Sequence, residues 1–459
     1  MNYREETDSL GTVRVPQEAY YGAQTRRAMD NFPVSSLRLS PVMIRSIARI
    51  KKAAALVNRR LGRLDPEHAR AVAEAADEVS AGEFDDQFPV DIFQTGSGTS
   101  TNMNVNEVIA TRANEVLTGQ RKTKSPVHPN DHVNAGQSSN DVIPSAIHIS
   151  ALLEIREKLI PAFSHLGREL EQKAEEFAHI RKIGRTHLQD AVVMTLGQEF
   201  SGYAEQAYLS VGRLEGLQDH LCRLALGGTA VGTGLNTHPE FAGRVIDVIA
   251  ADTGIPFIEA PNHFEAQGAC DGAVEAGGVL KTAAVSLSKI ANDIRWLASG
   301  PRCGLGEIRL PALQPGSSIM PGKVNPVICE SAIQACAHVI GNDTSLTLAG
   351  QGGYFELNLM LPLVAYKLLD SIGVLSGAAE ILARKCVSGI AANEARCTEN
   401  IEKSLAVVTG LVPHIGYERA ARIAHLAHET GKTVETVALE ENVLPAAELR
   451  RALYGETKV

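Results

Sequence analysis

The sequence predicts a mainly helical, all-α protein built around several long helices. Two observations carry this prediction: apolar residues recur every three or four positions over long segments, and strand signals are sparse throughout. The clearest apolar run comprises Leu280, Ala283, Leu287, Ile290, Ile294 and Leu297. This spacing matches one face of an α-helix, and such a seam packs against other long helices. We therefore expect a central bundle of long helices.

Helix start signals appear early in the chain. Residues 1–40 look irregular because prolines and turn residues interrupt them. Ser40-Pro41 then opens a helix that runs to about residue 57, since serine can cap a helix and proline suits its first position. A second helix follows Asp65-Pro66 and runs to about residue 79. These segments indicate a small N-terminal region of helices with irregular edges.

The middle of the chain carries the longest helical patterns. Leu152, Leu159 and Leu166 are spaced by seven, and residues 328–345 and 357–385 are typical of apolar helices. Their broad apolar faces favour association of subunits through this region, with a monomeric bundle as the alternative. After about residue 395 the pattern changes to short, charged helical pieces. We therefore predict three domains, spanning residues 1–138, 139–394 and 395–459.

Composition is that of a globular protein without bulk attraction to polyanions. The 459 residues are 44% hydrophobic and 21% charged, with a net charge of −9. This balance argues against nucleic acid and anionic membrane as partners, but a small anionic substrate responds only to its own pocket. We found no uninterrupted apolar stretch of about 18 residues, so no membrane span is expected.

The N-terminus and the cysteines indicate a cytoplasmic protein. Residues 1–6 include two acids and no apolar run, which fits neither a secretory nor a transit peptide. The seven cysteines are odd in number and widely spaced, without a C-x-x-C pair for zinc or a cluster for iron–sulfur. Reduced thiols in the cytosol are the natural interpretation.

Four polar stretches interrupt the helical pattern, and the first two combine hydroxyls, amides and carboxylates. Residues 95–102 (TGSGTSTN) place glycine and hydroxyls at the start of a helix, which suits a carboxylate or phosphate, although such runs are often simple caps. Residues 128–141 contain HPNDHVN and QSSND. Their histidine and aspartate residues admit a metal site, but the spacing fits no standard ligand set and favours a hydrogen-bonding loop.

The other two stretches add an imidazole, a lysine and a carboxylate. Residues 184–190 (GRTHLQD) place His187 among polar residues at an expected break between two helices, where either a structural or a catalytic role is open. Residues 316–326 (GSSIMPGKVNP) form a glycine- and proline-rich loop with two hydroxyls and Lys323, and Glu330 follows four residues later. Such a loop is either an ordinary surface loop or a lid with an anion-binding backbone.

Together these stretches favour a small polyanionic substrate and proton transfer without a cofactor. Neither a Walker A sequence nor a strand–GxGxxG–helix unit is present, which argues against nucleotide binding. No cysteine nucleophile with a nearby histidine stands out. The stretches lie far apart in the sequence, so a common pocket requires helices from different places to converge.

The motifs resemble those of the fumarase/aspartase superfamily, and class II fumarases in particular. GSGTSTNMNVNEV, HPNDHVN…QSSND, KIGRTHLQDA, LALGGTAVGTGLNTHPEFAGR, WLASGPRCGLGEI and GSSIMPGKVNP occur in the same order and cover nearly the whole chain. The resemblance implies a three-domain helical fold with a central long-helix bundle. It also implies a homotetramer whose active sites are each assembled from three subunits.

The resemblance also implies roles for individual residues in the hydration of fumarate to L-malate. Ser317 is expected to take the C3 proton, while His187, paired with Glu330, handles the proton at the departing hydroxyl. The residues expected to bind substrate are Ser97, Gly98, Thr99, Ser138, Ser139, Asn140, Thr186, Ser318, Lys323, Val324 and Asn325. A secondary carboxylate site is expected at His128, Pro129, Asn130 and Asp131. Ser125 replaces an arginine that is frequent in the family and linked with this secondary site, which argues for a weak or absent site here.

Other functions remain as alternatives, both among the lyases and outside enzymes. Aspartate ammonia-lyase is the nearer one, but aspartases usually carry Thr-Gln where this chain has Thr186-His187, and they differ at residues 236–241. Argininosuccinate and adenylosuccinate lyases fit less well because the fumarase-like stretches are so complete. A helical assembly protein that has lost catalysis is the other alternative, and the intact set of polar residues argues against it. No cofactor, metal, nucleic acid or membrane is expected.

Overall fold

The computed structural model describes residues 2–454. Within them lie eighteen α-helices, and the ten strands are short and paired in two-stranded sheets. The prediction of a mainly helical fold is therefore confirmed. The chain divides into two compact units, each made of three segments: residues 1–161, 211–285 and 335–376 form the first, and 162–210, 286–334 and 377–459 the second. The three domains proposed from the sequence stay a prediction, and their outer ends, residue 1 and residues 455–459, lie outside the described residues.

The first unit contains the N-terminal helices and the two helices that begin in polar stretches. Their bounds are α1 (Ala23–Asn31), α2 (Pro41–Arg60), α3 (Pro66–Ala81), α4 (Thr99–Thr118), α5 (Ser139–Glu154), α8 (Gln218–Leu221), α9 (Phe241–Thr253) and α10 (His263–Gly268). Proline is the first residue of both α2 and α3, as predicted. Asp65 caps α3 with its side chain, whereas the Ser40 side chain makes no capping hydrogen bond. The apolar face of α2 is buried, with Ile47 and Ile50 fully inaccessible.

The prediction that residues 1–40 are irregular is wrong. Strands β1 (Tyr3–Asp8) and β2 (Gly11–Pro16) form an antiparallel hairpin, and α1 follows. A two-residue connection joins the strands, and Gly11 adopts a φ of 114° that other residues avoid. Side chains along both strands alternate between more and less exposed positions. This alternation involves mostly polar residues, so it leaves little hydrophobic signal in the sequence.

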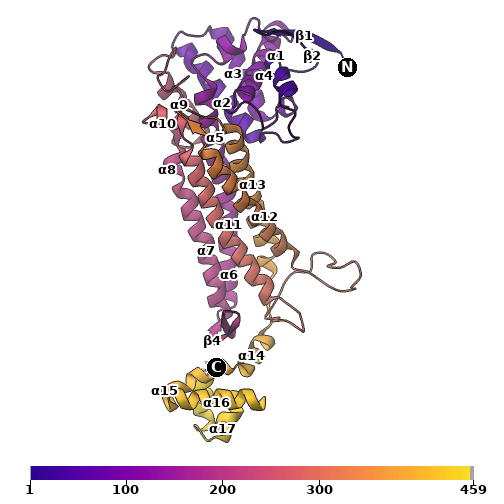
Figure 1. Cartoon of the computed structure of the whole chain (residues 1–459), viewed down its shortest axis with the longest axis vertical. Helices are drawn as coiled ribbons and strands as arrows, with labels where there is room; N and C mark the ends of the chain where they lie inside the picture. Colours follow the sequence, from indigo (N-terminus) through magenta and orange to yellow (C-terminus); the bar gives the residue numbers. More distant parts are fainter. Residues whose placement is uncertain (1, 455–459) are drawn as a thin grey trace. The chain divides into compact units, whose positions relative to one another are not determined.

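The long helices are α6 (Ile160–Glu176), α7 (Leu196–Gly216), α11 (Asp271–Leu297), α12 (Val327–Gly350) and α13 (Leu361–Lys385) (Figure 1). In the second unit, α6 contacts α13 through His165 and Glu380, and α7 contacts α11 through Tyr203 and Asp293. In the first unit, Asn342 of α12 bonds residues of α13. Segments 280–297, 328–345 and 357–385 are largely helical, as the apolar spacing predicted.

The second unit ends in a set of short helices with its own core. They are α14 (Glu394–Lys403), η5 (Leu405–Leu411), α15 (Val412–Ile415), α16 (Tyr417–Thr430), α17 (Val434–Glu440) and α18 (Ala446–Tyr454). Buried apolar side chains of these helices form one cluster that also includes Ile183 of strand β3 (Arg181–Thr186). That strand pairs with β4 (Gln189–Thr195) in an antiparallel hairpin. The hairpin is therefore anchored in the core of the C-terminal helices.

One helix among residues 2–454, Leu361–Gly389, is long and apolar enough by length and composition to cross a membrane. In the structure, 61% of its most apolar window is buried against the rest of the protein. Core helices of water-soluble bundles share these properties, because they too are apolar on most sides.

Candidate active site

The N-termini of α4 and α5 lie together in the first unit. Gly98, in the left-handed conformation with φ of 72°, precedes α4, and a Cβ there would come within 3.0–3.2 Å of the Ile143 side chain on α5. Asn102 of α4 donates from Nδ2 to Ser139 Oγ of α5 at 3.1 Å. The structure thus brings two of the predicted stretches, residues 95–102 and 138–141, side by side.

The hydroxyls at these two helix starts suit a carboxylate. At the start of α4, Ser97 Oγ lies 2.8 Å from Thr99 Oγ1. At the start of α5, Ser138 caps the helix. The partly exposed Asn140 donates from Nδ2 to Ala230 O at 2.8 Å. The first turn of a helix presents unpaired N–H groups and the positive end of its dipole. Two such ends, together with the hydroxyls and the amide, have the groups that suit an anion.

The carboxylate of Asp141 holds the start of α5 in place through hydrogen bonds. It is fully buried and accepts from Ser138 N, Gly227 N and Thr229 N, at 2.9, 3.1 and 3.0 Å. Burial raises the pKa of Asp141 to about 6, although these N–H groups and the charge of Lys51 favour the carboxylate. The residue thus ties the start of α5 to the glycine-rich segment at 227–234.

The predicted secondary site forms a turn of its own. Pro129–Val133 is a π-helical turn, and His128 caps it by accepting from Asn130 N and Asp131 N through Nδ1, both at 3.3 Å. Asp131 is mostly exposed and lies 3.3 Å from His128 Nδ1. Within residues 2–454, no group of three or more histidine, cysteine, aspartate or glutamate side chains is arranged to hold a metal ion.

His187 lies in a break between two helices, α6 and α7, as predicted, and this break is filled by the β3–β4 hairpin, with His187 at its tip. His187 and Leu188 form the two-residue turn, with φ values of 54° and 59°. Two consecutive left-handed residues are the pattern of a tight hairpin turn that matches strand twist. The side chains of Thr186 and His187 are both exposed there. The hairpin therefore presents the imidazole outward.

A buried ion cluster fixes the base of this hairpin. Arg185 donates from Nη1 and Nη2 to both carboxylate oxygens of Glu307, at 3.0 and 2.7 Å, and Lys182 Nζ lies 3.4 Å from the same carboxylate. Glu199 pairs with Lys182 at 2.7 Å, and Asn400 donates to Glu307 at 3.0 Å. Burial raises the pKa of Glu307, but Arg185 and Lys182 outweigh this and hold it below its ordinary value. The cluster is a rigid support two residues from His187.

The loop at residues 316–326 is closed by hydrogen bonds between its two ends. Gly316 N donates to Lys323 O at 2.8 Å, and Asn325 Nδ2 donates to Gly316 O at 2.7 Å. A Cβ on Gly316 would lie 2.7 Å from Lys323 O, so glycine is required for this closure. Gly322 adopts a φ of 80°. The loop is thus a defined structure rather than a loose connection.

Ser317 sits inside this loop with its hydroxyl oxygen facing backbone donors. Its Oγ accepts from Met320 N at 2.9 Å and from Ile319 N at 3.2 Å. Two N–H groups aimed at one hydroxyl oxygen stabilise negative charge on that oxygen, so they lower the free-energy cost of forming an alkoxide there. This is the property that a serine base requires.

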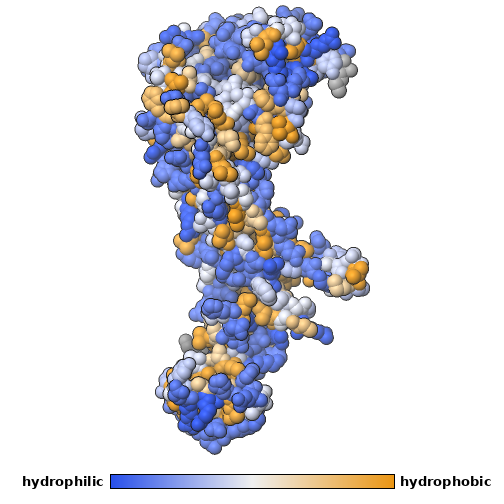
Figure 2. Space-filling model, in the orientation of Figure 1, coloured by the Kyte–Doolittle hydropathy of each residue, from blue (hydrophilic) through white to orange (hydrophobic). Residues whose placement is uncertain are grey.

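The remaining loop groups are exposed. Ser318, Lys323 and Val324 face solvent, and Ile319 at the loop tip is 84% exposed. The loop projects away from the helices of its unit, and Figure 2 shows apolar surface at its end. Glu330, half-buried, lies in the first turn of α12. Within the described chain, no hydrogen bond or ion pair joins His187 to Glu330.

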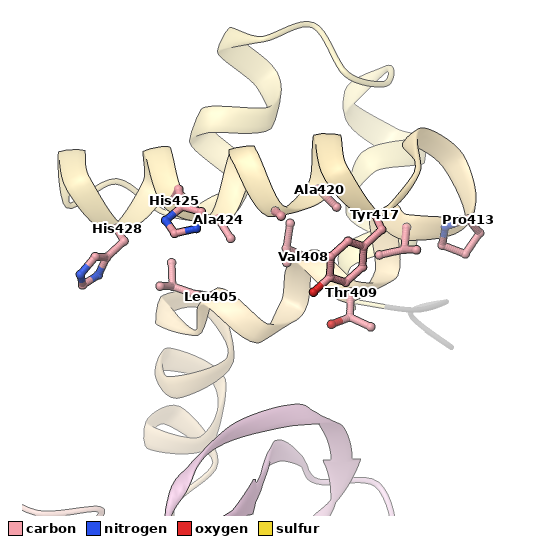
Figure 3. A pocket seen from close by; sticks show the side chains of 11 residues that line it. Leu405, Val408, Thr409, Pro413, Tyr417, Ala420, Ala424, His425 and His428 are labelled. Carbon is pink, nitrogen blue, oxygen red and sulfur yellow. The ribbon is translucent and has the colours of Figure 1, made fainter.

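A pocket of about 880 Å³ lies elsewhere, in the C-terminal helices (Figure 3). Its wall is formed mainly by η5 and α16, with Val408, Ala420 and Ala424 between His425 and Tyr417, and Leu405 below His425 (Figure 3). None of the predicted site residues lines it. Its largely alkyl wall does not suit a dicarboxylate, which needs several donors.

Comparison with known proteins places these features in a family. The family model described as Lyase matches residues 11–341, and the one for the fumarase C C-terminus matches residues 407–456. A class II fumarate hydratase of Thermosynechococcus vestitus is 53% identical, over 98% of this chain and 96% of its own length. One of Nitrosomonas europaea is 54% identical, over 95% of each chain. The chain belongs to the class II fumarate hydratases.

A solved structure agrees with this assignment. The class II fumarase of Schistosoma mansoni superposes with a TM-score of 0.96 at 41% identity, covering 99% of this chain and 98% of that one. The resemblance to class II fumarases inferred from the motifs is thereby confirmed. The roles of individual residues in this fumarate hydratase chain rest on the geometry above and stay predictions.

Sequence reasoning did not predict that five charged residues are buried: Lys51, Glu107, Asp141, Lys182 and Glu307. All five are at most 3% exposed. For Lys51 a signal exists, because it occupies the apolar face of its helix between Ile47 and Ala54. For Glu307 the partner lies 122 residues away in the sequence, and no local pattern indicates it.

Proposed function

We propose that this chain catalyses the reversible hydration of fumarate to L-malate. The observation that carries the proposal is the hydroxyl of Ser317, which accepts two backbone N–H groups. Breaking the C3–H bond beside a carboxylate needs a base and donors that strengthen as charge develops. The family membership supplies the substrate class, and the loop supplies the base.

In the malate-to-fumarate direction, the alkoxide of Ser317 takes the C3 proton. The electrons of that bond first move onto the neighbouring carboxylate, and they then form the C2–C3 double bond as the C2–O bond breaks. His187, polarised by Glu330, gives its proton to the departing hydroxyl, which leaves as water. Groups on opposite faces of the substrate suit anti elimination. The proposed route uses only side chains and backbone of the protein.

The carboxylates are assigned to two sets of groups. One set is at the starts of α4 and α5: Ser97, Gly98, Thr99, Ser138, Ser139 and Asn140. The other set comprises Thr186, Ser318, Lys323, Val324 and Asn325. Lys323 adds the positive charge that stabilises a dianionic substrate and its more highly charged intermediate.

We also propose a homotetramer with active sites shared between subunits. Large apolar side chains are exposed on the long helices, among them Val285 at 54%, Trp296 at 50% and Leu348 at 61%. Exposed apolar surface of this kind marks a protein interface. The exposed loop tip, and the lack of a hydrogen bond or ion pair between His187 and Glu330 among the described residues, agree with a site completed by another subunit. Light scattering after size-exclusion chromatography should give four times the mass of the chain.

We further propose that the chain works in the cytoplasm. Six cysteines, Cys222, Cys270, Cys303, Cys329, Cys386 and Cys397, are thiols outside any disulfide, as expected in a reducing compartment. Its relatives differ in compartment: one from Rhizopus oryzae, 51% identical over the whole of this chain and 93% of its own length, is named mitochondrial.

The direct test is ultraviolet absorbance of fumarate in two cuvettes, one with L-malate and one with L-aspartate. The proposal predicts fumarate from malate alone. Fumarate formed from aspartate alone would replace the hydratase function with an ammonia-lyase function. No fumarate in either cuvette would refute both functions.

A further inference from the structure

Lys51 is a fully buried lysine on the apolar face of α2. Within residues 2–454 its ammonium makes no ion pair, and Nζ donates instead to Asn134 Oδ1 at 2.9 Å and Gln137 Oε1 at 3.0 Å. Burial lowers the pKa of Lys51 to about 7, although the charge of Asp141 partly offsets this. A buried cation that is held only by neutral amides is costly. We therefore examined what the two amide side chains bound by the Lys51 ammonium do in the structure.

Both partners of Lys51 lie in the segment that leads into α5. Gln137 directly precedes Ser138, the residue that caps the helix, and Asn134 donates from Nδ2 to Gln137 O at 3.1 Å. Gln137 in turn donates from Nε2 to Val133 O at 3.1 Å. The ammonium therefore fixes the two side chains around which this segment is folded.

The network reaches the proposed substrate groups through a second path. Asn134 Oδ1 also accepts from Asn102 Nδ2 and Asn106 Nδ2, both at 3.2 Å. The same Nδ2 of Asn102 donates to Ser139 Oγ at 3.1 Å. Lys51 is thus two hydrogen-bonded side chains away from Ser139. The path joins α2, α4 and the start of α5.

Donors are scarce in this network. The Oδ1 atoms of Asn102 and Asn106 are buried and have no hydrogen-bond partner among the residues that the structure describes. Without the ammonium, Asn134 would lose one of three donors, and Gln137 Oε1 would lose its donor. Because unpaired buried acceptors are unfavourable, the side chains would rotate toward other partners and release the start of α5.

We infer that Lys51 is a positioning residue for dicarboxylate binding, which holds Ser138, Ser139 and Asn140 in place through Asn134 and Gln137. The inference rests on the proposed function. It assigns Lys51 an effect on substrate affinity and not on proton transfer, because Ser317 and His187 belong to the other compact unit of the chain.

The experiment compares Lys51→Met with Lys52→Met in steady-state turnover of L-malate. Lys52 is the neighbouring lysine of the same helix, and it pairs with Asp77 at the surface. Lys51→Met should raise KM about tenfold or more, as expected for loss of charged hydrogen bonds, and change kcat less than about threefold. The thermal shift caused by succinate, a dicarboxylate that does not react, should shrink in parallel. Lys52→Met should match the wild type in both measurements.

Asn134→Leu removes the same link from its other end. It should also raise KM, and the double variant with Lys51→Met should be no worse than the more impaired single variant, since both substitutions break one path. If Lys51→Met does not fold, the KM of Asn134→Leu by itself tests the inference. Folded variants whose KM stays within twofold of the wild-type value would overturn the inference. The proposed function would still stand in that case, provided that the wild type turns over malate. Absence of turnover in the wild type would refute the proposed function and the inference with it.

Discussion

Replacing Glu307 with glutamine tests whether the buried ion cluster supports the His187 hairpin. Glu307 is completely inaccessible and accepts both Nη atoms of Arg185, which is only 15% exposed at its side chain. Removing one partner of a buried ion pair costs about 3–5 kcal/mol. Lys182 still pairs with Glu199 at 2.7 Å in this variant. The residue left without its ion-pair partner is therefore mainly Arg185. We therefore expect a loss of about 3 kcal/mol in the free energy of unfolding, the lower end of that range.

The assay is urea-induced unfolding followed by circular dichroism, with all variants at one protein concentration. Glu399→Gln is the matched control, because Glu399 belongs to the same unit and forms a surface pair with Arg396. Its unfolding midpoint should stay close to that of the wild type. A Glu307→Gln protein within about 0.5 kcal/mol of the wild type would refute the reasoning.

The same variant has a defined pH dependence. The net pKa of Glu307 lies below its ordinary value of 4.5 in the folded state. The ionised carboxylate therefore stabilises the fold above that pH, and this stabilisation is lost as pH falls through the lower folded-state value. The difference in unfolding free energy between the wild type and Glu307→Gln should accordingly shrink on acidification. A difference that grows at acidic pH would contradict the assignment.

Three further predictions concern the reaction. Ser317→Ala should lower kcat about 10³-fold without changing the unfolding midpoint; near-normal kcat would remove Ser317 as the base. His187→Asn should lower kcat and flatten one limb of its pH profile, and an unchanged profile would exclude His187 as acid or base. Gly316→Ala should lower kcat about 10²-fold by opening the loop, because the new Cβ would meet Lys323 O at 2.7 Å; full activity would show that loop closure is dispensable.

The helices could be predicted because their signals are local. Prolines at the first positions of α2 and α3 and the repeated apolar spacing of α11 both act over a few residues. The composition of the loop around Ser317 left an ordinary surface loop and an anion-binding backbone as alternatives, and the structure adds which N–H groups face the hydroxyl.

The hairpin that carries His187 could not be predicted in this way. Tight two-residue turns with positive φ are normally marked by asparagine, aspartate or glycine, and here the turn is His187-Leu188. Strain of this kind is maintained by surrounding structure and is concentrated at functional sites. The structure that maintains it here is the cluster at Glu307, which comes from 122 residues farther along the chain.

Buried charges were the other feature that local patterns left undetermined. The spacing of α2 places Lys51 among apolar residues, but its acceptors at 134 and 137 are more than 80 residues away. Periodicity states which face of a helix is buried, whereas the identity of a buried polar partner depends on tertiary contacts.

The most direct test of the account is proton NMR of the malate formed from fumarate in D₂O. Proton transfer by Ser317 and delivery of water on the opposite face predict L-malate with a single deuterium at C3, in one diastereomer only, and no product from Ser317→Ala on the same time scale. Deuterium in both C3 positions during the first turnover, or undiminished labelling by Ser317→Ala, would contradict the account.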